Sequence, residues 1–286
     1  MKFLRFLLFP FAIIYDGVTT LRNFFFDIEI FKHTTFQLPI IVVGNLSVGG
    51  TGKTPQIEYL IRLLKDQFKI AILSRGYKRK TEGYVLLNNT HSALEVGDEP
   101  LQFFKKFNNI NVAVDANRVE GVTNLITKKN PQVILLDDAF QHRKIKGSFY
   151  ILLTKYDDLF VEDFLLPMGY LRESSKGAKR ANLIVVTKCP PDLSMEQQHN
   201  IKIKLRKFKK EVFFTTITYG KIKSEANEFF IDEIKNHQIL LITGIANPNP
   251  LLSFLNDNSI NFKHLKYKDH HNFSSKEIKQ IQNEYH

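Results

Sequence analysis

The chain has 286 residues and a formal net charge of +11, so it can build one large or two modest domains, and an anionic partner is expected. Its single cysteine, Cys189, excludes an internal disulfide framework and fits a reducing compartment. The charge leaves nucleic acid, anionic lipid and phosphorylated substrates open as partners.

The first region, residues 1–37, mixes apolar and basic residues. Its apolar run ends at Asp16, which is short of the roughly 20 residues that a membrane-spanning helix needs. No small-residue cleavage site follows, so a secretory signal peptide is also a poor fit. We expect an amphipathic helix that lies on a membrane surface. A terminal helix packed on its own domain is the alternative, and both can hold on different helix faces.

A glycine-rich stretch, GNLSVGGTGKTP at 44–55, follows an apolar segment at 39–44 that is typical of a buried parallel strand. A helical pattern over 54–66 comes next. Strand, turn and helix in this order are what a phosphate-binding loop requires, because backbone amides and the helix dipole then meet a polyphosphate. A ligand-free glycine turn is the alternative.

Ser47 stands where the standard pattern has its first glycine, but the later glycines still let the backbone turn. Lys53 would reach the β- and γ-phosphates, and Thr54 would hold Mg²⁺. The residues expected to bind nucleotide are Ser47, Val48, Gly49, Gly50, Thr51, Gly52, Lys53 and Thr54.

Short apolar runs and helical patterns alternate along the rest of the first 210 residues. This alternation predicts an α/β fold, with a mostly parallel sheet covered by helices on both faces. The further strands are expected near 69–73, 111–114, 132–137, 149–153 and 182–187, and the further helices near 99–107, 117–128 and 194–208.

The segment VILLDDAF has four apolar residues leading into two carboxylates, which is the Walker-B pattern. Asp137 and Asp138 are therefore candidates for the metal side of the site; helix capping is the alternative. GDEP at 97–100 places Asp98 and Glu99 at a predicted helix start, where capping is again a strong alternative.

Two loops supply cations and aromatic groups. LSRGYKRK contains Arg75 and Tyr77, and LLPMGYLRES contains Arg172 and Glu173. Arginine suits bidentate binding of phosphate, although any one of these charges can simply be solvated.

The segment VVTKCPPD carries Thr187 and Lys188 of a guanine-reading motif, but Pro190 replaces the aspartate that would bind guanine, so we expect ATP. The basic run KIKLRKFKK lies at the end of a predicted helix and is expected to be a solvated surface. It matches no known RNA or DNA module, so we expect no nucleic-acid partner.

From about residue 211 the pattern changes. EVFFTTITYG and NEFFID are expected to pair as a two-stranded connector, followed by a strand–helix–strand–helix unit. In DHHNF, at 269–273, one histidine oriented by a carboxylate would help a base. The chain stops where the sheet would need another strand, so we expect an incomplete second domain. The expected domains are 1–37, 38–218 and 219–286.

Eight motifs in this order resemble the tetraacyldisaccharide 4′-kinase family of lipid A biosynthesis: GNLSVGGTGKTP, LSRGY, GDEP, DDAFQHR, LLPMGYLRE, VTKCP, TGIANP and DHHNF. The resemblance implies a P-loop NTPase-like α/β/α core with an N-terminal amphipathic helix. It also implies a second, smaller α/β domain joined by a two-stranded linker, with the active site in the cleft.

The implied reaction transfers the γ-phosphate of ATP to the 4′-hydroxyl of tetraacyldisaccharide 1-phosphate, giving lipid IVA. The implied enzyme is peripheral (monotopic), at the cytoplasmic face of the bacterial inner membrane, and we expect a monomer. Its partners would be the lipid A disaccharide 1-phosphate precursor and the membrane surface. The rival is a soluble P-loop ATPase that acts as a switch for a partner protein.

The family's motifs also assign roles. Lys53 holds phosphate, Asp98 is the base on the sugar hydroxyl, and His270 is its partner. The metal side is assigned to Thr54, Glu99 and Asp138, and the substrate side to Arg75, Tyr77, Arg118, Asp137, Arg172 and Glu173. Two departures from the family pattern are Ala139, where DDGFQH has glycine, and the absence of the TTEKD-like C-terminal segment.

Overall fold

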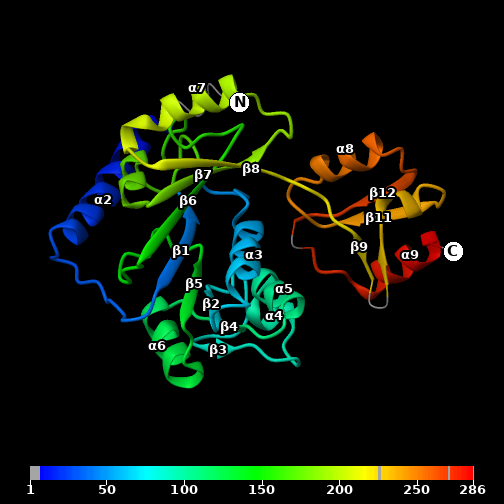
Figure 1. The fold of residues 1–286 in the computed structure, drawn as a ribbon, viewed down its shortest axis with the longest axis horizontal. Helices are drawn as coiled ribbons and strands as arrows, with labels where there is room; N and C mark the ends of the chain where they lie inside the picture. The colour runs from blue at the N-terminus through cyan, green and yellow to red at the C-terminus, as the bar shows by residue number, and fades with distance from the viewer. Residues whose placement is uncertain (1–6, 225–226, 270, 286) are drawn as a thin grey trace. The chain divides into compact units, whose positions relative to one another are not determined.

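The computed structural model describes residues 7–224, 227–269 and 271–285. The chain divides into two compact units, Met1–Ile217 and Thr218–His286. Figure 1 shows the chain coloured from the N-terminus to the C-terminus. The N-terminal helical segment groups with the first unit.

The first unit is built on one eight-stranded sheet with the order β3-β4-β2-β5-β1-β6-β7-β8. Every neighbouring pair is parallel except β3 and β4, which are antiparallel. The short edge strand β3 was not expected from the sequence. The strands are β1 (Ile40–Asn45), β2 (Ile70–Ser74), β3 (Val85–Leu86), β4 (Asn111–Val114), β5 (Val133–Asp137), β6 (Phe149–Lys155), β7 (Leu183–Cys189) and β8 (Glu211–Thr216).

Helices cover both faces of this sheet, as the alternation predicts (Figure 1). Val43 packs with α3 and α5 on one face, whereas its neighbour Val42 packs with α6 on the other, because successive strand residues point to opposite faces. The helices are α2 (Phe9–Asp27), α3 (Lys53–Leu64), α4 (Ala93–Val96), α5 (Asp98–Lys106), α6 (Arg118–Lys129) and α7 (Met195–Leu205), with 3₁₀ turns η1 (Ser175–Arg180) and η2 (Arg206–Phe208).

The expected pairing of EVFFTTITYG with NEFFID is wrong. Glu211–Thr216 is β8, which pairs in parallel with β7 at the edge of the large sheet. Val212 and Phe214 alternate along β8 and pack against the apolar cluster beneath β7. Pairing with β7 therefore buries apolar side chains of this segment. The two-stranded element instead joins β9 (Ile222–Lys223) to β10 (Glu228–Phe229) in antiparallel pairing.

The second unit continues with the expected strand–helix–strand–helix order. Strands β11 (Ile239–Thr243) and β12 (Phe262–Lys266) pair in parallel, with α8 (Asn249–Asp257) between them in the chain and α9 (Ser275–Tyr285) after them. A 3₁₀ turn, η3 (Ile231–Ile234), precedes β11.

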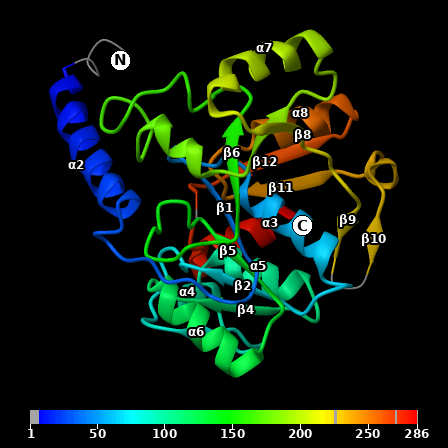
Figure 2. The same ribbon diagram turned by 60° about the vertical axis from the view of Figure 1, so that its left-hand side comes forward.

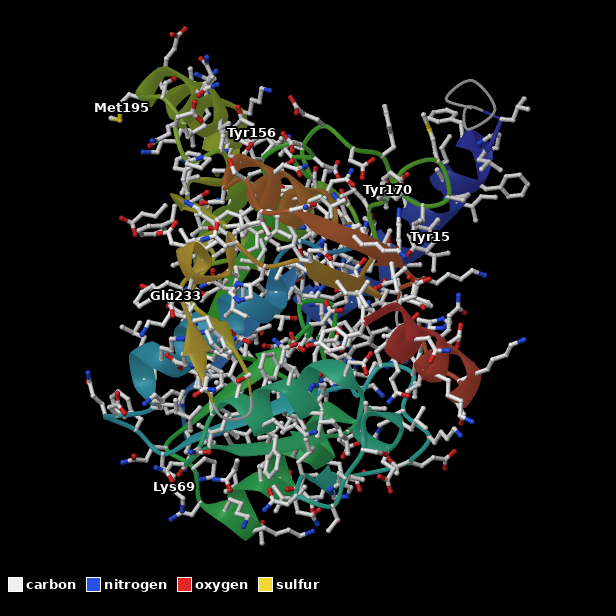
Figure 3. All side chains as sticks on the ribbon, turned by 90° about the vertical axis from the view of Figure 1, so that its right-hand side faces the viewer. Tyr15, Lys69, Tyr156, Tyr170, Met195 and Glu233 are labelled. Carbon is white, nitrogen blue, oxygen red and sulfur yellow. The ribbon has the colours of Figure 1, made fainter. Side chains whose placement is uncertain are left out.

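Helix α2 runs along the outside of the first unit (Figure 2). Its inner face is partly polar: the Tyr15 hydroxyl donates to the Arg172 carbonyl oxygen at 2.9 Å, and the Asn23 amide donates to Glu173 at 2.8 Å. Figure 3 shows Tyr15 near Tyr170, on the loop that leads to Arg172. Ala12 and Phe26 complete the buried face.

The outer face of α2 is apolar. Phe11, Ile14, Val18 and Leu21 recur at helical spacing and are each more than half exposed. This distribution reverses that of an ordinary surface helix, because the apolar face points away from the core. Among the described residues, no helix has the length and apolar character needed to cross a membrane.

Candidate active site

The glycine-rich loop and the paired carboxylates meet at one edge of the sheet. Strands β1 and β5 are parallel neighbours, and Val43 lies opposite Asp137. The loop after β1 and the residues that end β5 therefore leave the sheet side by side. In open α/β sheets this carboxyl edge is where ligands bind.

The loop has the backbone that a phosphate cradle needs. Gly49 and Gly52 have φ angles of +100° and +83°, which side chains other than glycine rarely adopt, and Gly52 caps the start of α3. Ser47 is buried in an antiparallel bridge to Leu171, and the next amide, Val48 N–H, donates to the Tyr170 carbonyl oxygen. The backbone at Ser47 is thus held by strand-like pairing, so a serine is accommodated where the standard pattern has glycine.

Lys53 begins α3 and points back toward the carboxylates. Its ammonium donates to Asn45 Oδ1 at 3.2 Å and lies 3.7 Å from Asp138 Oδ1. Arg172 also pairs with Asp138, at 2.9 Å. Burial alone would raise the pKa of Asp138, but Lys53 and Arg172 hold the pKa below its ordinary value. Lys53, Asp138 and Arg172 therefore form one ionised cluster at the loop.

Asp137 has a different environment. It is buried, and the Ser74 hydroxyl donates to its Oδ2 at 3.1 Å. Its Oδ1 has no hydrogen-bond partner among the described residues. Burial, and then the neighbouring charge of Asp138, raise the pKa of Asp137 to about 6. The two adjacent carboxylates therefore differ in pKa: the pKa of Asp137 is raised, and the pKa of Asp138 is lowered.

The SRGY turn and the start of α5 are in direct backbone contact. A Cβ at Gly97 would lie 3.2 Å from Gly76 Cα, and Gly97 has φ +92°. Asp98 is the first residue of α5, and Gly97 is its N-cap. Asp98 and Glu99 are therefore favoured by the helix dipole, but neither occupies the capping position itself. The close approach brings α5 beside the turn that carries Arg75 and Tyr77.

Gly97→Ala should lower both stability and turnover. An alanine at this φ costs about 1–3 kcal/mol and must push the Gly76 backbone away, which moves Asp98. Thermal unfolding and phosphoryl-transfer rates measure the two effects. Gly83→Ala is the matched control, since Gly83 also has a positive φ but would place its Cβ more than 4 Å from any neighbour. Equal turnover losses in both variants would contradict the positioning role.

Two residues expected on the substrate side are buried and hydrogen-bonded within the first unit. Arg118 is 1% exposed and donates to the carbonyl oxygens of Asp115 and Asp137. Glu173 is 3% exposed and accepts from Asn23, Gln141 and Arg180. Their contacts hold neighbouring loops and α2 in place, and Arg118 also lines a cavity beside the end of α2.

Nearly the whole chain matches the model of one family. A family model described as tetraacyldisaccharide-1-P 4′-kinase matches residues 4–286. The chain belongs to this family. Curated tetraacyldisaccharide 4′-kinases of Flavobacterium johnsoniae and Flavobacterium psychrophilum are 54% and 56% identical to it, covering 99% and 98% of this chain and 84% and 83% of the relatives.

A solved structure of the family has the same fold. The crystal structure of LpxK from Aquifex aeolicus in complex with ATP is 32% identical, has a TM-score of 0.80, and is matched over 95% of this chain and 84% of that one. The P-loop NTPase-like α/β architecture is therefore confirmed.

The donor set fits the Mg·ATP that the tetraacyldisaccharide 4′-kinase family implies. Thr51 Oγ1, in the loop, and Asp137 Oδ1 are buried without hydrogen-bond partners among the described residues. The described residues contain no cluster of three or more His, Cys, Asp or Glu side chains able to cage a metal. Mg²⁺ does not need such a cage, because it usually binds one or two carboxylates, substrate phosphates and waters.

The sequence does not predict a contact between the glycine-rich loop and strand β7. The Thr187 hydroxyl, at the end of β7, donates to the Thr51 carbonyl oxygen at 2.8 Å and to the Thr154 carbonyl oxygen at 3.2 Å. Lys188 Nζ approaches Gly50, and burial, then Lys155, lower the pKa of Lys188. The sequence assigns Thr187 and Lys188 to a fragment of a guanine-reading motif and to the family motif VTKCP, with no role in the loop; their position near a strand end is the signal for one.

The histidine expected to assist the base is His270. His270 lies outside the described residues. The next residue, His271, pairs with Glu277 at 2.9 Å and stacks on Tyr267. These contacts of His271 are both with residues of the second unit.

Proposed function

We propose that this chain transfers the γ-phosphate of ATP to the 4′-hydroxyl of tetraacyldisaccharide 1-phosphate, giving lipid IVA. The observation that carries the proposal is the cluster of Lys53, Asp138 and Arg172 at the glycine loop of a chain that belongs to the 4′-kinase family. Such a cluster supplies the cations and the carboxylate that phosphoryl transfer needs. The family membership disfavours the soluble ATPase switch.

We assign the roles as follows. Bound Mg·ATP would supply the transferable phosphoryl group and neutralise its charge, with Thr54, Glu99 and Asp138 as the metal-side residues. Lys53 and the amides of residues 47–54 would hold the phosphates. Asp98 would accept the proton of the 4′-hydroxyl while that oxygen bonds to the γ-phosphorus and the bond to ADP breaks. Arg75, Tyr77 and Arg172 would orient the acceptor, and His270 remains a candidate catalytic residue.

We further propose that residues 1–37 attach a monomeric enzyme to the cytoplasmic face of the inner membrane. In this division, residues 38–218 are the kinase core and residues 219–286 are the linker and smaller domain. The support for membrane attachment is the outward apolar face of α2, which offers side chains to the interface while its inner face stays bonded to the core.

Replacing Ile14 and Val18 with glutamate should weaken binding to phosphatidylethanolamine–phosphatidylglycerol vesicles by at least ~10-fold, because burying one apolar side chain is worth about 1.5–3 kcal/mol. Vesicle sedimentation measures the partitioning. Ile203→Glu is the control, since Ile203 is also an exposed apolar helical residue but belongs to a different helix, α7. Unchanged partitioning of the double variant would exclude the outer face of α2 as the membrane contact.

The test of the function is transfer of labelled γ-phosphate from Mg·ATP to tetraacyldisaccharide 1-phosphate in detergent micelles. We expect one labelled lipid product that requires both substrates. Hydrolysis of ATP without lipid labelling, increased by an added protein, would favour the switch and overturn the kinase proposal.

A further inference from the structure

A buried carboxylate, Glu58, joins the two helices that carry proposed catalytic groups. Helix α3 begins at Lys53, and helix α5 begins at Asp98. Both helices pack on the same face of the large sheet, where Ile61 of α3 and Phe103 of α5 belong to one buried apolar cluster (Figure 1). Glu58 lies in the second turn of α3 and is only 5% exposed. None of the catalytic roles proposed for this chain involves this buried charge.

The carboxylate of Glu58 accepts hydrogen bonds from three side chains. Its Oε2 accepts from Lys106 Nζ at 2.6 Å and from Arg62 Nη2 at 3.0 Å, and its Oε1 accepts from Gln102 Nε2 at 2.9 Å. Arg62 belongs to α3, whereas Gln102 and Lys106 belong to α5. Both carboxylate oxygens are therefore satisfied, and two of the three donors connect Glu58 to the neighbouring helix.

These bonds are directional, unlike the apolar contacts between the two helices. Burial of apolar area is non-directional, so the packing of Ile61 and Phe103 alone would allow α5 to slide or rotate by small amounts. A charge-assisted hydrogen bond has a defined length and angle. A buried ion pair costs desolvation energy and adds little net stability, so its contribution is the arrangement that it selects. The Arg62 guanidinium adds a second link, because it lies 5.4 Å from the ring centroid of Phe107, the C-cap of α5.

The face of α5 that meets Glu58 also carries the proposed catalytic carboxylates. Gln102 and Lys106 are four residues apart and lie on one face of the helix. Asp98 is four residues before Gln102, and Glu99 is three residues before it, so both lie near the same face at the N-terminal end of α5. A rotation or a slide of α5 would therefore move both carboxylates relative to the glycine-rich loop that leads into α3.

We propose that Glu58 is a positioning residue, which fixes α5 against α3 and thereby holds Asp98 in place for proton abstraction beside the phosphate loop. Glu58 acts through α5, because its own oxygens are occupied by protein donors. The inference rests on the proposed function, in which Asp98 is the base. Loss of the link should lower the chemical rate more than the affinity for ATP, because the phosphate loop leads into α3 rather than α5.

The first test removes the link from each side in the full chain. Lys106→Met and Glu58→Gln should each lower kcat for phosphoryl transfer by roughly 10- to 100-fold, because a displacement of about 1 Å can cost about 10²-fold in rate. The affinity for ATP should stay within about 2-fold of wild type. Lys106→Arg keeps the charge and should retain turnover within about 2-fold. Equal losses of turnover and ATP affinity, or no loss in either variant, would overturn the proposal.

The matched control is Lys105→Met, which removes the same charge from the adjacent position of α5. Lys105 is not among the three donors to Glu58, so its loss should leave kcat within about 2-fold of wild type. Ile201→Ala controls for stability, because Ile201 is buried on α7 in a different apolar cluster from α5. Thermal unfolding is measured for all variants. A comparable loss of kcat in Ile201→Ala would mean that lower stability explains the effect, and would overturn the positioning role.

The second test asks whether Glu58 acts through Asp98. In the Asp98→Asn background, Lys106→Met should lower the remaining rate by less than about 2-fold, because the group that it would misplace is already lost. Independent effects would instead multiply. Losses that multiply would overturn the positioning role.

Hydrogen exchange of the α5 amides tests the link without any turnover. Over residues 98–106, Lys106→Met and Glu58→Gln should exchange at least ~10-fold faster than wild type or Lys105→Met, because opening α5 then breaks fewer charge-assisted hydrogen bonds. Unchanged exchange would overturn the proposal. A wild type that transfers no phosphate would refute the proposed function, whereas faster exchange in the two variants would still establish that Glu58 fixes α5.

Discussion

Lys53→Ala should reduce phosphoryl transfer by about 10³-fold or more, by comparison with the single charge-stabilising arginine of related phosphate-loop enzymes, which is worth about 10³–10⁵ in rate. Lys53 is the cation of the glycine loop, and its ammonium already lies 3.7 Å from Asp138. The rate of labelled γ-phosphate transfer at saturating Mg·ATP measures the effect. Turnover near the wild-type rate would mean that the loop is not the phosphate cradle.

The control for Lys53→Ala is Lys65→Ala, at the C-terminal end of the same helix. Lys65 pairs with exposed Asp66 and lies a full helix length from the loop, so its loss should leave turnover within about 2-fold of wild type. Thermal unfolding of both variants separates chemistry from stability. Some loss of stability is expected in Lys53→Ala, because Asp138 then keeps only Arg172 as an ion-pair partner among the described residues.

Asp98→Asn should lower kcat by about 10²–10⁴-fold while the affinity for ATP stays within about 2-fold, because a general base acts in the transition state. Asparagine keeps the shape of the side chain at the start of α5 but removes its charge. Single-turnover transfer gives the chemical rate, and nucleotide titration gives the affinity.

The neighbouring carboxylate provides the comparison. Glu99→Gln, one residue along α5, should weaken the dependence on Mg²⁺ concentration if Glu99 serves the metal side, whereas Asp98→Asn should leave that dependence unchanged. Parallel losses of ATP affinity and turnover in Asp98→Asn would move Asp98 to the nucleotide side and leave the base unassigned.

Local sequence determined much of the core. The glycine-rich loop is continuous in the chain, so its glycines, Lys53 and the helix that follows can be predicted without any tertiary contact. The buried parallel strands are short apolar runs, and the alternation with helices is a property of consecutive segments. The expected strands from 39 to 187 and the helix starts agree with the structure to within a residue or two for this reason.

The sequence-based predictions of strands were wrong or incomplete where the pairing partner of a strand is distant in the chain. EVFFTT is a strand by its own alternation, but whether it pairs with β7 or with a following segment depends on which edge is open. The two-residue strand β3 has too little sequence to produce a pattern, and only its pairing with β4 defines it.

By itself, then, the sequence determined the class of fold, the family and the strand–turn–helix around the glycine-rich loop, because these depend on residues that are close in the chain or on motifs in a fixed order. Only the tertiary structure decided which charges are available to a ligand. Arg118 and Glu173 are both expected on the substrate side, yet both are buried and hydrogen-bonded within the first unit. Arg22 and Lys144 both line the cavity beside the end of α2, although no local pattern connects them. Burial and long-range packing set the environment of a charge, and neither is encoded in its immediate neighbours.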